Sequence, residues 1–113
     1  CFLVNPFFIL FNMYTIEIAN IKEFNHSNVK IIIHDGTPIA VFKIKDKFYA
    51  IDNRCPHRGA SLGDGPLENE IVTCPWHSWK FSLKSGIAIE NPNCFIKTFS
   101  VFVEHDIVKL EYD

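Results

Sequence analysis

Cys55-Pro56-His57 and Cys74-Pro75-Trp76-His77 are the two short motifs that decide the fold, and sixteen residues separate His57 from Cys74. Each motif offers one thiol and one imidazole beside a proline. A structural zinc finger usually draws paired cysteines from one segment and paired histidines from another, whereas here the two ligand types are interleaved. Two such loops can hold a binuclear metal centre, with both sulfurs on one metal ion and both nitrogens on the other.

The four residues gain their meaning from being together. A lone buried cysteine is usually a small hydrophobic residue, and a lone histidine is usually a surface residue. Four of them in two proline-containing loops favour a metal site instead. The other cysteines and histidines have no partner at ligand spacing, and we interpret them as ordinary core or surface residues: Cys1, Cys94, His26, His34 and His105.

The chain around the motifs is typical of an all-β protein. Residues 53–66 contain three glycines and two prolines, which indicates a shaped loop. Elsewhere, β-branched and aromatic residues come in short runs between turn signals such as Asp35-Gly36, which predicts antiparallel sheets in a sandwich or barrel. We expect strands at 14–19, 29–34, 38–44, 48–52, 71–74, 79–83, 87–90, 96–104 and 107–112, with a short helical turn at 21–24.

Composition excludes several classes of protein. A length of 113 residues indicates one domain, and 48% hydrophobic with 21% charged residues excludes a disordered chain. A net charge of -2 argues against nucleic-acid binding. Four cysteines among so many large apolar residues do not suggest a secreted disulfide scaffold. The sequence shows neither a nucleotide-binding glycine loop nor a nucleophile paired with a base, so we do not expect an enzyme that acts alone.

The N-terminal segment is apolar but too short to span a membrane. Cys1 to Ile16 carries no charged side chain, yet a membrane span takes about 20 apolar residues, and no Lys or Arg precedes the run as a signal peptide requires. The only methionine is Met13. We interpret residues 1–12 as an upstream extension and 13–113 as the functional domain; the alternative is a hydrophobic anchor or a packing strand.

From Val29 to about Val108 the sequence resembles the Rieske family, and most closely the Rieske-type ferredoxins and the small subunits of assimilatory nitrite reductases. The resemblance rests on residues 55–60, 62–65 and 74–77. It implies an all-β Rieske fold with a small cluster-binding subdomain, at about 53–93, formed by two ligand loops. It also implies one [2Fe-2S] cluster, in which one iron has two histidine ligands in place of two cysteines. These would be His57 and His77, with Cys55 and Cys74 on the other iron, while a mononuclear zinc site is the alternative.

The resemblance also implies which residues surround the cluster. These are Pro56, Arg58, Gly59, Trp76, Ser78, Trp79 and Pro92, the last in a covering loop at 90–93. Arg58 would hold either an acidic residue of its own domain or a partner. Ser78 stands where the family commonly has glycine, which leaves the backbone geometry after His77 open.

Departures from the high-potential members of the family predict a low reduction potential. Those members have a cysteine pair joined as a disulfide, where this chain has Ala60 and Trp76, and a serine and a tyrosine where it has Trp79 and Phe81. Hydrogen bonds from such hydroxyls stabilise the reduced state. Without them, we expect a midpoint toward the lower end of the Rieske range of about -150 to +300 mV.

The resemblance therefore implies a soluble one-electron carrier that passes electrons from a flavoprotein reductase to a terminal oxygenase. The alternative is the small subunit of an assimilatory nitrite reductase, with its large subunit as the partner. A zinc-bound structural module is a third possibility. We expect a monomer in the cytoplasm, where a reducing environment keeps thiolates available, and no nucleic-acid or membrane partner.

Overall fold

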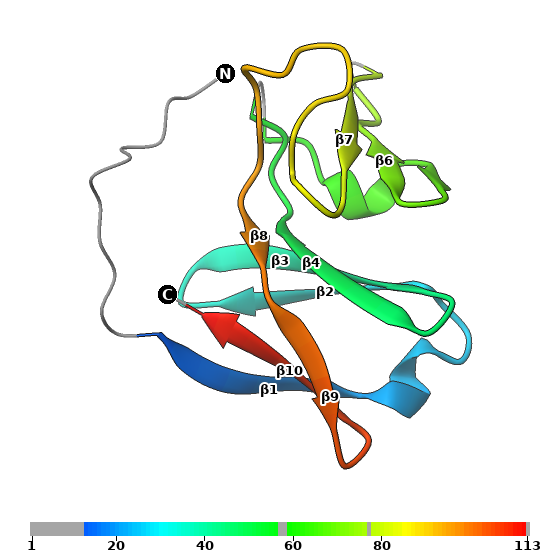
Figure 1. Cartoon of the computed structure of the whole chain (residues 1–113), viewed down its shortest axis with the longest axis vertical. Helices are drawn as coiled ribbons and strands as arrows, with labels where there is room; N and C mark the ends of the chain where they lie inside the picture. Colours follow the sequence, from blue (N-terminus) through cyan, green and yellow to red (C-terminus); the bar gives the residue numbers. More distant parts are fainter. Residues whose placement is uncertain (1–12, 57–58, 77, 113) are drawn as a thin grey trace.

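The computed structural model describes residues 13–56, 59–76 and 78–112. Its strands form three antiparallel sheets, which lie one above another in Figure 1. The central sheet has the order β2-β3-β4-β8, the lower sheet β1-β10-β9 and the upper sheet β5-β6-β7. The all-β prediction is confirmed.

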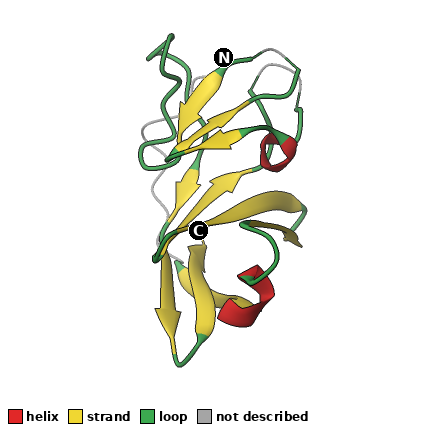
Figure 2. Cartoon of the chain, turned by 90° about the vertical axis from the view of Figure 1, so that its right-hand side faces the viewer, coloured by secondary structure: helices red, strands yellow, loops and turns green. Residues whose placement is uncertain are grey.

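The element bounds are as follows. The central sheet contains β2 (Val29–His34), β3 (Thr37–Ile44), β4 (Lys47–Asp52) and β8 (Thr98–Phe99); the lower sheet contains β1 (Tyr14–Asn20), β9 (Val101–Glu104) and β10 (Ile107–Tyr112); the upper sheet contains β5 (Leu67–Glu68), β6 (Ile71–Thr73) and β7 (Lys80–Ser82). Two short 3-10 helices, η1 (Ile21–Phe24) and η2 (Leu62–Asp64), lie in the connections and are drawn in red in Figure 2.

Strand β3 of the central sheet is buried on both faces at residues 39–42. Side chains alternate across a strand, so β3 contributes to two apolar clusters. Ala40 and Phe42 belong to the cluster that contains Cys55 and Cys74, which we call the upper core. Ile39 and Val41 belong to the cluster that contains the buried residues of β10, which we call the lower core. All four are at most 1% exposed. A strand that faces two cores must be apolar at consecutive positions, and this explains the unbroken run at 39–42.

Two hairpins fix the strand register through left-handed turn residues. Asp35 and Gly36 have φ of 52° and 79°, and His105 and Asp106 have φ of 53° and 66°. Two consecutive left-handed residues form the type I′ turn, whose twist matches that of antiparallel strands. The turns place His34 opposite Thr37 and Glu104 opposite Ile107. The prediction of a hairpin at Asp35-Gly36 is confirmed.

Three expectations about the strands were wrong or incomplete. The expected strand at 96–104 divides at Ser100, because β8 pairs with β4 in the central sheet while β9 pairs with β10 in the lower one. In Figure 1 this orange segment descends from the upper part of the molecule to the lower sheet. The expected strand at 87–90 forms only isolated bridges. Strand β5 was not predicted, since two residues carry no periodic signal.

Within the residues that the structure describes, no helix is long and apolar enough to cross a membrane. The interpretation of residues 1–12 concerns a segment outside the described residues and stays a prediction.

Candidate metal centre

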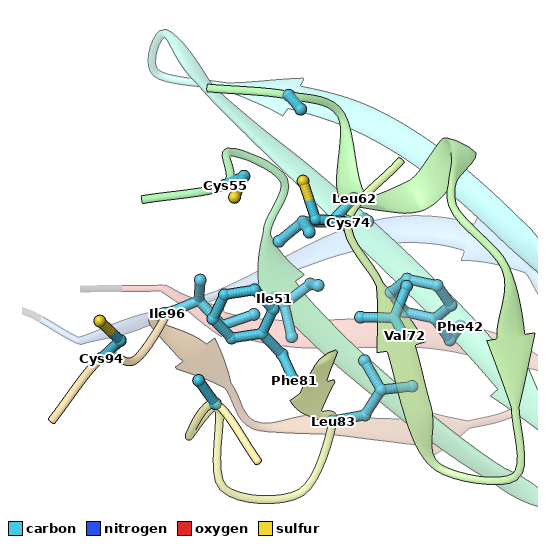
Figure 3. Packing of buried hydrophobic residues seen from close by; sticks show 13 residues of the cluster. Phe42, Ile51, Cys55, Leu62, Val72, Cys74, Phe81, Leu83, Cys94 and Ile96 are labelled. Atoms are coloured by element: carbon cyan, nitrogen blue, oxygen red, sulfur yellow. The ribbon is translucent and has the colours of Figure 1, made fainter. Parts of the chain in front are cut away.

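The two motif cysteines lie in the upper core. Cys55 follows β4 and is 2% exposed, and Cys74 follows β6 and is 1% exposed. Both are thiols rather than halves of a disulfide. Figure 3 shows them on the same side of the apolar cluster, above Ile51 in this view, with Cys94 apart from both. Segments nineteen positions apart in the sequence thus deliver two sulfurs to one region.

The two cysteine loops close with the same hydrogen bonds. The Cys55 N–H donates to the Ala60 carbonyl at 2.9 Å, and the Gly59 N–H donates to the Cys55 carbonyl at 2.8 Å. In the second loop, the Cys74 N–H donates to the Trp79 carbonyl at 2.7 Å, and the Ser78 N–H donates to the Cys74 carbonyl at 3.0 Å. Each loop therefore begins at a buried cysteine and closes four and five residues later.

Each loop also turns through a left-handed residue at the same offset from its cysteine. Gly59 has φ of 73° and Ser78 has φ of 61°. The shared Cys-Pro start and the small residue four positions on are visible in the sequence, but the matching backbone hydrogen bonds are not. The structure answers the question raised by Ser78, because serine takes the conformation that glycine would supply.

Replacing Ser78 with glycine is expected to stabilise the folded protein by about 0.5–1 kcal/mol. A left-handed non-glycine residue costs roughly 1–2 kcal/mol, and the greater freedom of glycine in the unfolded chain cancels part of the gain. Thermal denaturation of the cluster-loaded protein measures the effect. Ser85→Gly, at an exposed turn residue that does not itself have a left-handed φ, is the control and should not stabilise; equal stabilisation by both changes would contradict the argument.

The remaining site predictions fall on both described and undescribed residues. His57, Arg58 and His77 lie outside the described residues. Among the residues described, no group of three or more His, Cys, Asp or Glu side chains is placed to hold a metal ion. The cysteine pair is thus the part of the predicted ligand set that the structure brings together.

The predicted surrounding residues take different positions. Pro56 is half-buried, Gly59 and Ser78 are exposed, and Trp79 packs against the upper core. Trp76 is 64% exposed and is next in sequence to His77, the second histidine of the predicted ligand set. Pro92 is exposed in a turn that the Cys94 N–H closes by donating to the Asn91 carbonyl at 2.9 Å.

The expected covering loop does approach the second cysteine loop. Glu90 and Asn91 line the same hollow as Ser78 and Trp79, which has a volume of about 450 Å³. This places the start of the 90–93 loop beside the second loop. The specific role given to Pro92 stays a prediction.

Two positions at which high-potential members of the family have a cysteine or a tyrosine are occupied here by buried apolar residues. Ala60 is 1% exposed and Phe81 is fully buried in the upper core. Neither side chain can form a disulfide or donate a hydrogen bond to sulfur. Two buried thiols in matching loops with an apolar floor suit the sulfur half of a [2Fe-2S] site, because burial in apolar surroundings limits water access to the metal.

Arg54, one of the two arginines in the chain, pairs with Asp52, the last residue of β4. Its guanidinium donates to both carboxylate oxygens of Asp52, through Nε at 2.8 Å and Nη2 at 2.6 Å. This hydrogen-bonded pair raises the pKa of Arg54. Because both side chains belong to the segment leading into the first loop, the ion pair fixes the exit of β4.

Sequence reasoning missed two residues that shape the site, Asn53 and Gly65. Asn53 is 5% exposed and joins the end of β4 to the segment after the first cysteine loop. Gly65 packs directly against the backbone that leads into Cys74. An asparagine before the motif and a glycine within a glycine-rich loop give no separate signal in one sequence.

Comparison with known proteins agrees with this geometry. The Rieske [2Fe-2S] domain family matches residues 15–100. The ferredoxin component of the naphthalene 1,2-dioxygenase/salicylate 5-hydroxylase systems of Ralstonia sp. is 31% identical over 99 residues, which are 87% of this chain and 95% of that protein.

Two solved structures illustrate the range of similar folds. A chain in the complex of reduced oxygenase and oxidised ferredoxin in carbazole 1,9a-dioxygenase superposes with a TM-score of 0.77 at 26% identity, covering 85% of this chain and 91% of that one. The nitrite reductase small subunit assigned in Mycobacterium tuberculosis gives 0.81 at 16% identity, covering 90% and 97%. At that identity the second likeness shows the fold alone.

The match over residues 15–100 includes both cysteine loops and strands from all three sheets. The apolar region around Cys55 and Cys74 suits the [2Fe-2S] cluster that this family binds. The chain belongs to the Rieske [2Fe-2S] domain family, and its cofactor is a [2Fe-2S] cluster.

Proposed function

We propose that this protein is a Rieske ferredoxin, a one-electron carrier that receives electrons from a flavoprotein reductase and delivers them to a terminal oxygenase. The observation that carries the proposal is that the second cysteine loop combines a buried cysteine, Cys74, with an exposed aromatic residue, Trp76. A carrier needs such an arrangement, with its redox centre shielded from water yet close to a surface where a partner can dock. The similarity to dioxygenase ferredoxin components supports the same role.

The proposed ligands are Cys55 and Cys74 on one iron and His57 and His77 on the other. When bound, the cluster takes up and releases one electron. The chain's own residues keep water from the sulfur side, since Ala60, Leu62 and Phe81 are at most 1% exposed around the two cysteines. We place the functional domain at 13–113, with residues 1–12 as an extension.

The proposed carrier has a low potential. Phe81 and Ala60 leave the sulfur side without hydroxyl donors or a disulfide at those positions, and fewer hydrogen bonds to sulfur make reduction less favourable. Redox titration with electron paramagnetic resonance of the dithionite-reduced protein tests the ligand set and the potential together. A midpoint above roughly +100 mV, within the Rieske range, would contradict the proposal, and a colourless zinc-bound protein would overturn it.

Trp76→Ala is expected to weaken productive docking to the oxygenase about tenfold or more while leaving the midpoint potential unchanged, since exposed tryptophans often carry much of an interface's binding energy. The apparent affinity in reconstituted electron transfer is the measurement. Phe102→Ala is the matched control, because Phe102 is a 38% exposed aromatic residue in the lower sheet. If both variants transfer electrons as well as the parent, Trp76 has no docking role.

The alternative, a small subunit of an assimilatory nitrite reductase, differs in its partner rather than its fold. Such a subunit would stay in a permanent complex with a large subunit, whereas a ferredoxin exchanges partners. Affinity purification of the tagged protein from its own cells distinguishes them: a stoichiometric large partner favours nitrite reduction, and a monomer that leaves no retained partner favours the carrier. We propose the cytoplasm as its location, because reduced thiols are kept available there.

A further inference from the structure

Asn53 is a buried polar residue whose side-chain nitrogen and oxygen each make a hydrogen bond. It lies two positions before Cys55 and is 5% exposed. Among the residues that the structure describes (13–56, 59–76 and 78–112), it is the one polar or charged residue that is buried. Its Nδ2 donates to Ser61 Oγ at 2.7 Å, and its Oδ1 accepts from the Gly63 N–H at 2.6 Å. Buried amides are retained where their hydrogen bonds are satisfied, so the two bonds define one orientation of this side chain.

The same residue is anchored to the central sheet. The Asn53 N–H donates to the carbonyl of Pro38 on β3 at 2.8 Å. The backbone of Asn53 is thus fixed to a strand, and its side chain reaches across to the segment 61–65, which contains η2. We call this segment the strap.

The strap continues the first cysteine loop. The Cys55 N–H donates to Ala60, the residue before the strap, and Arg54 forms a β-bridge with Ser61. On its outer side the strap packs against β2, because a Cβ atom at Gly63 would lie 3.0 Å from Ile31 Cδ1. The Asn53 side chain therefore holds the strap at the point where the first loop ends.

At its far end the strap touches the second cysteine loop. A Cβ atom at Gly65 would lie 1.8 Å from the Thr73 carbonyl oxygen and 3.2 Å from Pro75 Cδ. Thr73 also donates its N–H to the Pro66 carbonyl at 2.9 Å. Thr73 and Pro75 are the two residues on either side of Cys74, so the strap packs against the backbone that carries the second sulfur.

We propose that Asn53 is a positioning residue for the [2Fe-2S] cluster: through the strap it holds the Cys55 loop against the Cys74 loop and so sets the separation of the two sulfurs. The inference rests on the cysteine ligands named in the proposed function. Without the Asn53 side chain, the strap keeps its contacts with Thr73 and Ile31 but loses the two hydrogen bonds that tie it to the end of β4. The two loops can then move relative to one another.

The experiment compares three variants of the cluster-loaded protein. Asn53→Ala removes both hydrogen bonds, and Ser61→Ala removes only the bond to Nδ2. Val108→Ala is the control, because Val108 is fully buried in the lower core and its loss destabilises the fold away from the strap. The rate of cluster loss to an excess of iron chelator is followed by visible absorbance, with the electron paramagnetic resonance spectrum and the melting temperature recorded for each.

Asn53→Ala is expected to lose its cluster about tenfold faster or more, the scale typical of outer-shell partners of metal ligands, and to show a shifted or broadened resonance. Ser61→Ala should lie between it and the parent. Val108→Ala should lower the melting temperature with a spectrum unchanged from the parent. The inference is overturned if Asn53→Ala keeps the parent spectrum and loses its cluster no faster than Val108→Ala does.

Two further outcomes are also decisive. Should Asn53→Ala fail to fold, Ser61→Ala decides the matter, and a parent-like rate and spectrum in that variant count against the strap. A parent protein with no Rieske-type resonance would instead overturn the proposed ligand set. The variants therefore test the inference, whereas the parent protein tests the proposed function.

Discussion

Cys74→Ala is expected to yield a protein without a [2Fe-2S] cluster, with no visible absorbance and no resonance after dithionite reduction. Cys74 is 1% exposed and lies at the start of a loop closed by two hydrogen bonds to its own backbone. An alanine fits this position, so the backbone of the loop can form, but the thiolate is gone. Cluster ligands cannot be replaced by a methyl group, since iron–sulfur clusters are held by thiolate or imidazole.

The control for this change is Cys94→Ala, which removes a sulfur held in a disulfide bond rather than as a thiol. Cys94 is also buried in the upper core, at 3% exposure, but it lies outside the two motifs and apart from Cys55 and Cys74 in Figure 3. Both variants remove one buried sulfur from the same core. Cys94→Ala should keep the colour and the resonance, and a coloured Cys74→Ala protein would show that Cys74 is not a ligand.

Gly65→Ala is expected to destabilise the folded protein by about 3 kcal/mol or more, or to prevent accumulation of the loaded protein. The new Cβ atom would lie 1.8 Å from the carbonyl oxygen of Thr73. That oxygen belongs to the backbone of β6, which pairs with β7, so it cannot move aside without disturbing the upper sheet. The effect is steric, because Gly65 has an ordinary φ of -85° that alanine also adopts.

Gly36→Ala separates steric overlap from backbone strain. Gly36 has φ of 79°, and a Cβ atom there would meet no atom within 4 Å. Its replacement should therefore cost only the left-handed penalty of roughly 1–2 kcal/mol. Chemical denaturation of the three proteins gives the comparison, and a Gly65→Ala protein as stable as Gly36→Ala would refute the packing of the strap against β6.

The parts of the fold that sequence could predict are those with local causes. The strand at 29–34 and the turn after it were predicted at the observed residues, because β-branched periodicity and Asp35-Gly36 act within a few positions. The division at Ser100 was not predicted, since it depends on which sheet each half of the segment joins. A continuous apolar run does not indicate which distant strand each part of it pairs with.

The candidate site also combines features that have local causes with features that depend on the folded structure. The cysteine and histidine motifs could be read from the sequence because ligand type and spacing are local properties. The matched closure of the two loops and the role of Asn53 could not, because both depend on hydrogen bonds between residues that are brought together only by folding. A single asparagine has many structural uses, and only its partners at Ser61 and Gly63 distinguish them.

Strand β3 has a consequence for how the protein unfolds. Its consecutive residues belong alternately to the upper and the lower core, so neither core can be dismantled while the other remains intact. Unfolding should be a single cooperative event, and the free energy released when the cysteine loops bind the cluster is shared by the whole chain. Cluster binding should therefore also stabilise β1 and β10, although neither strand contributes a ligand.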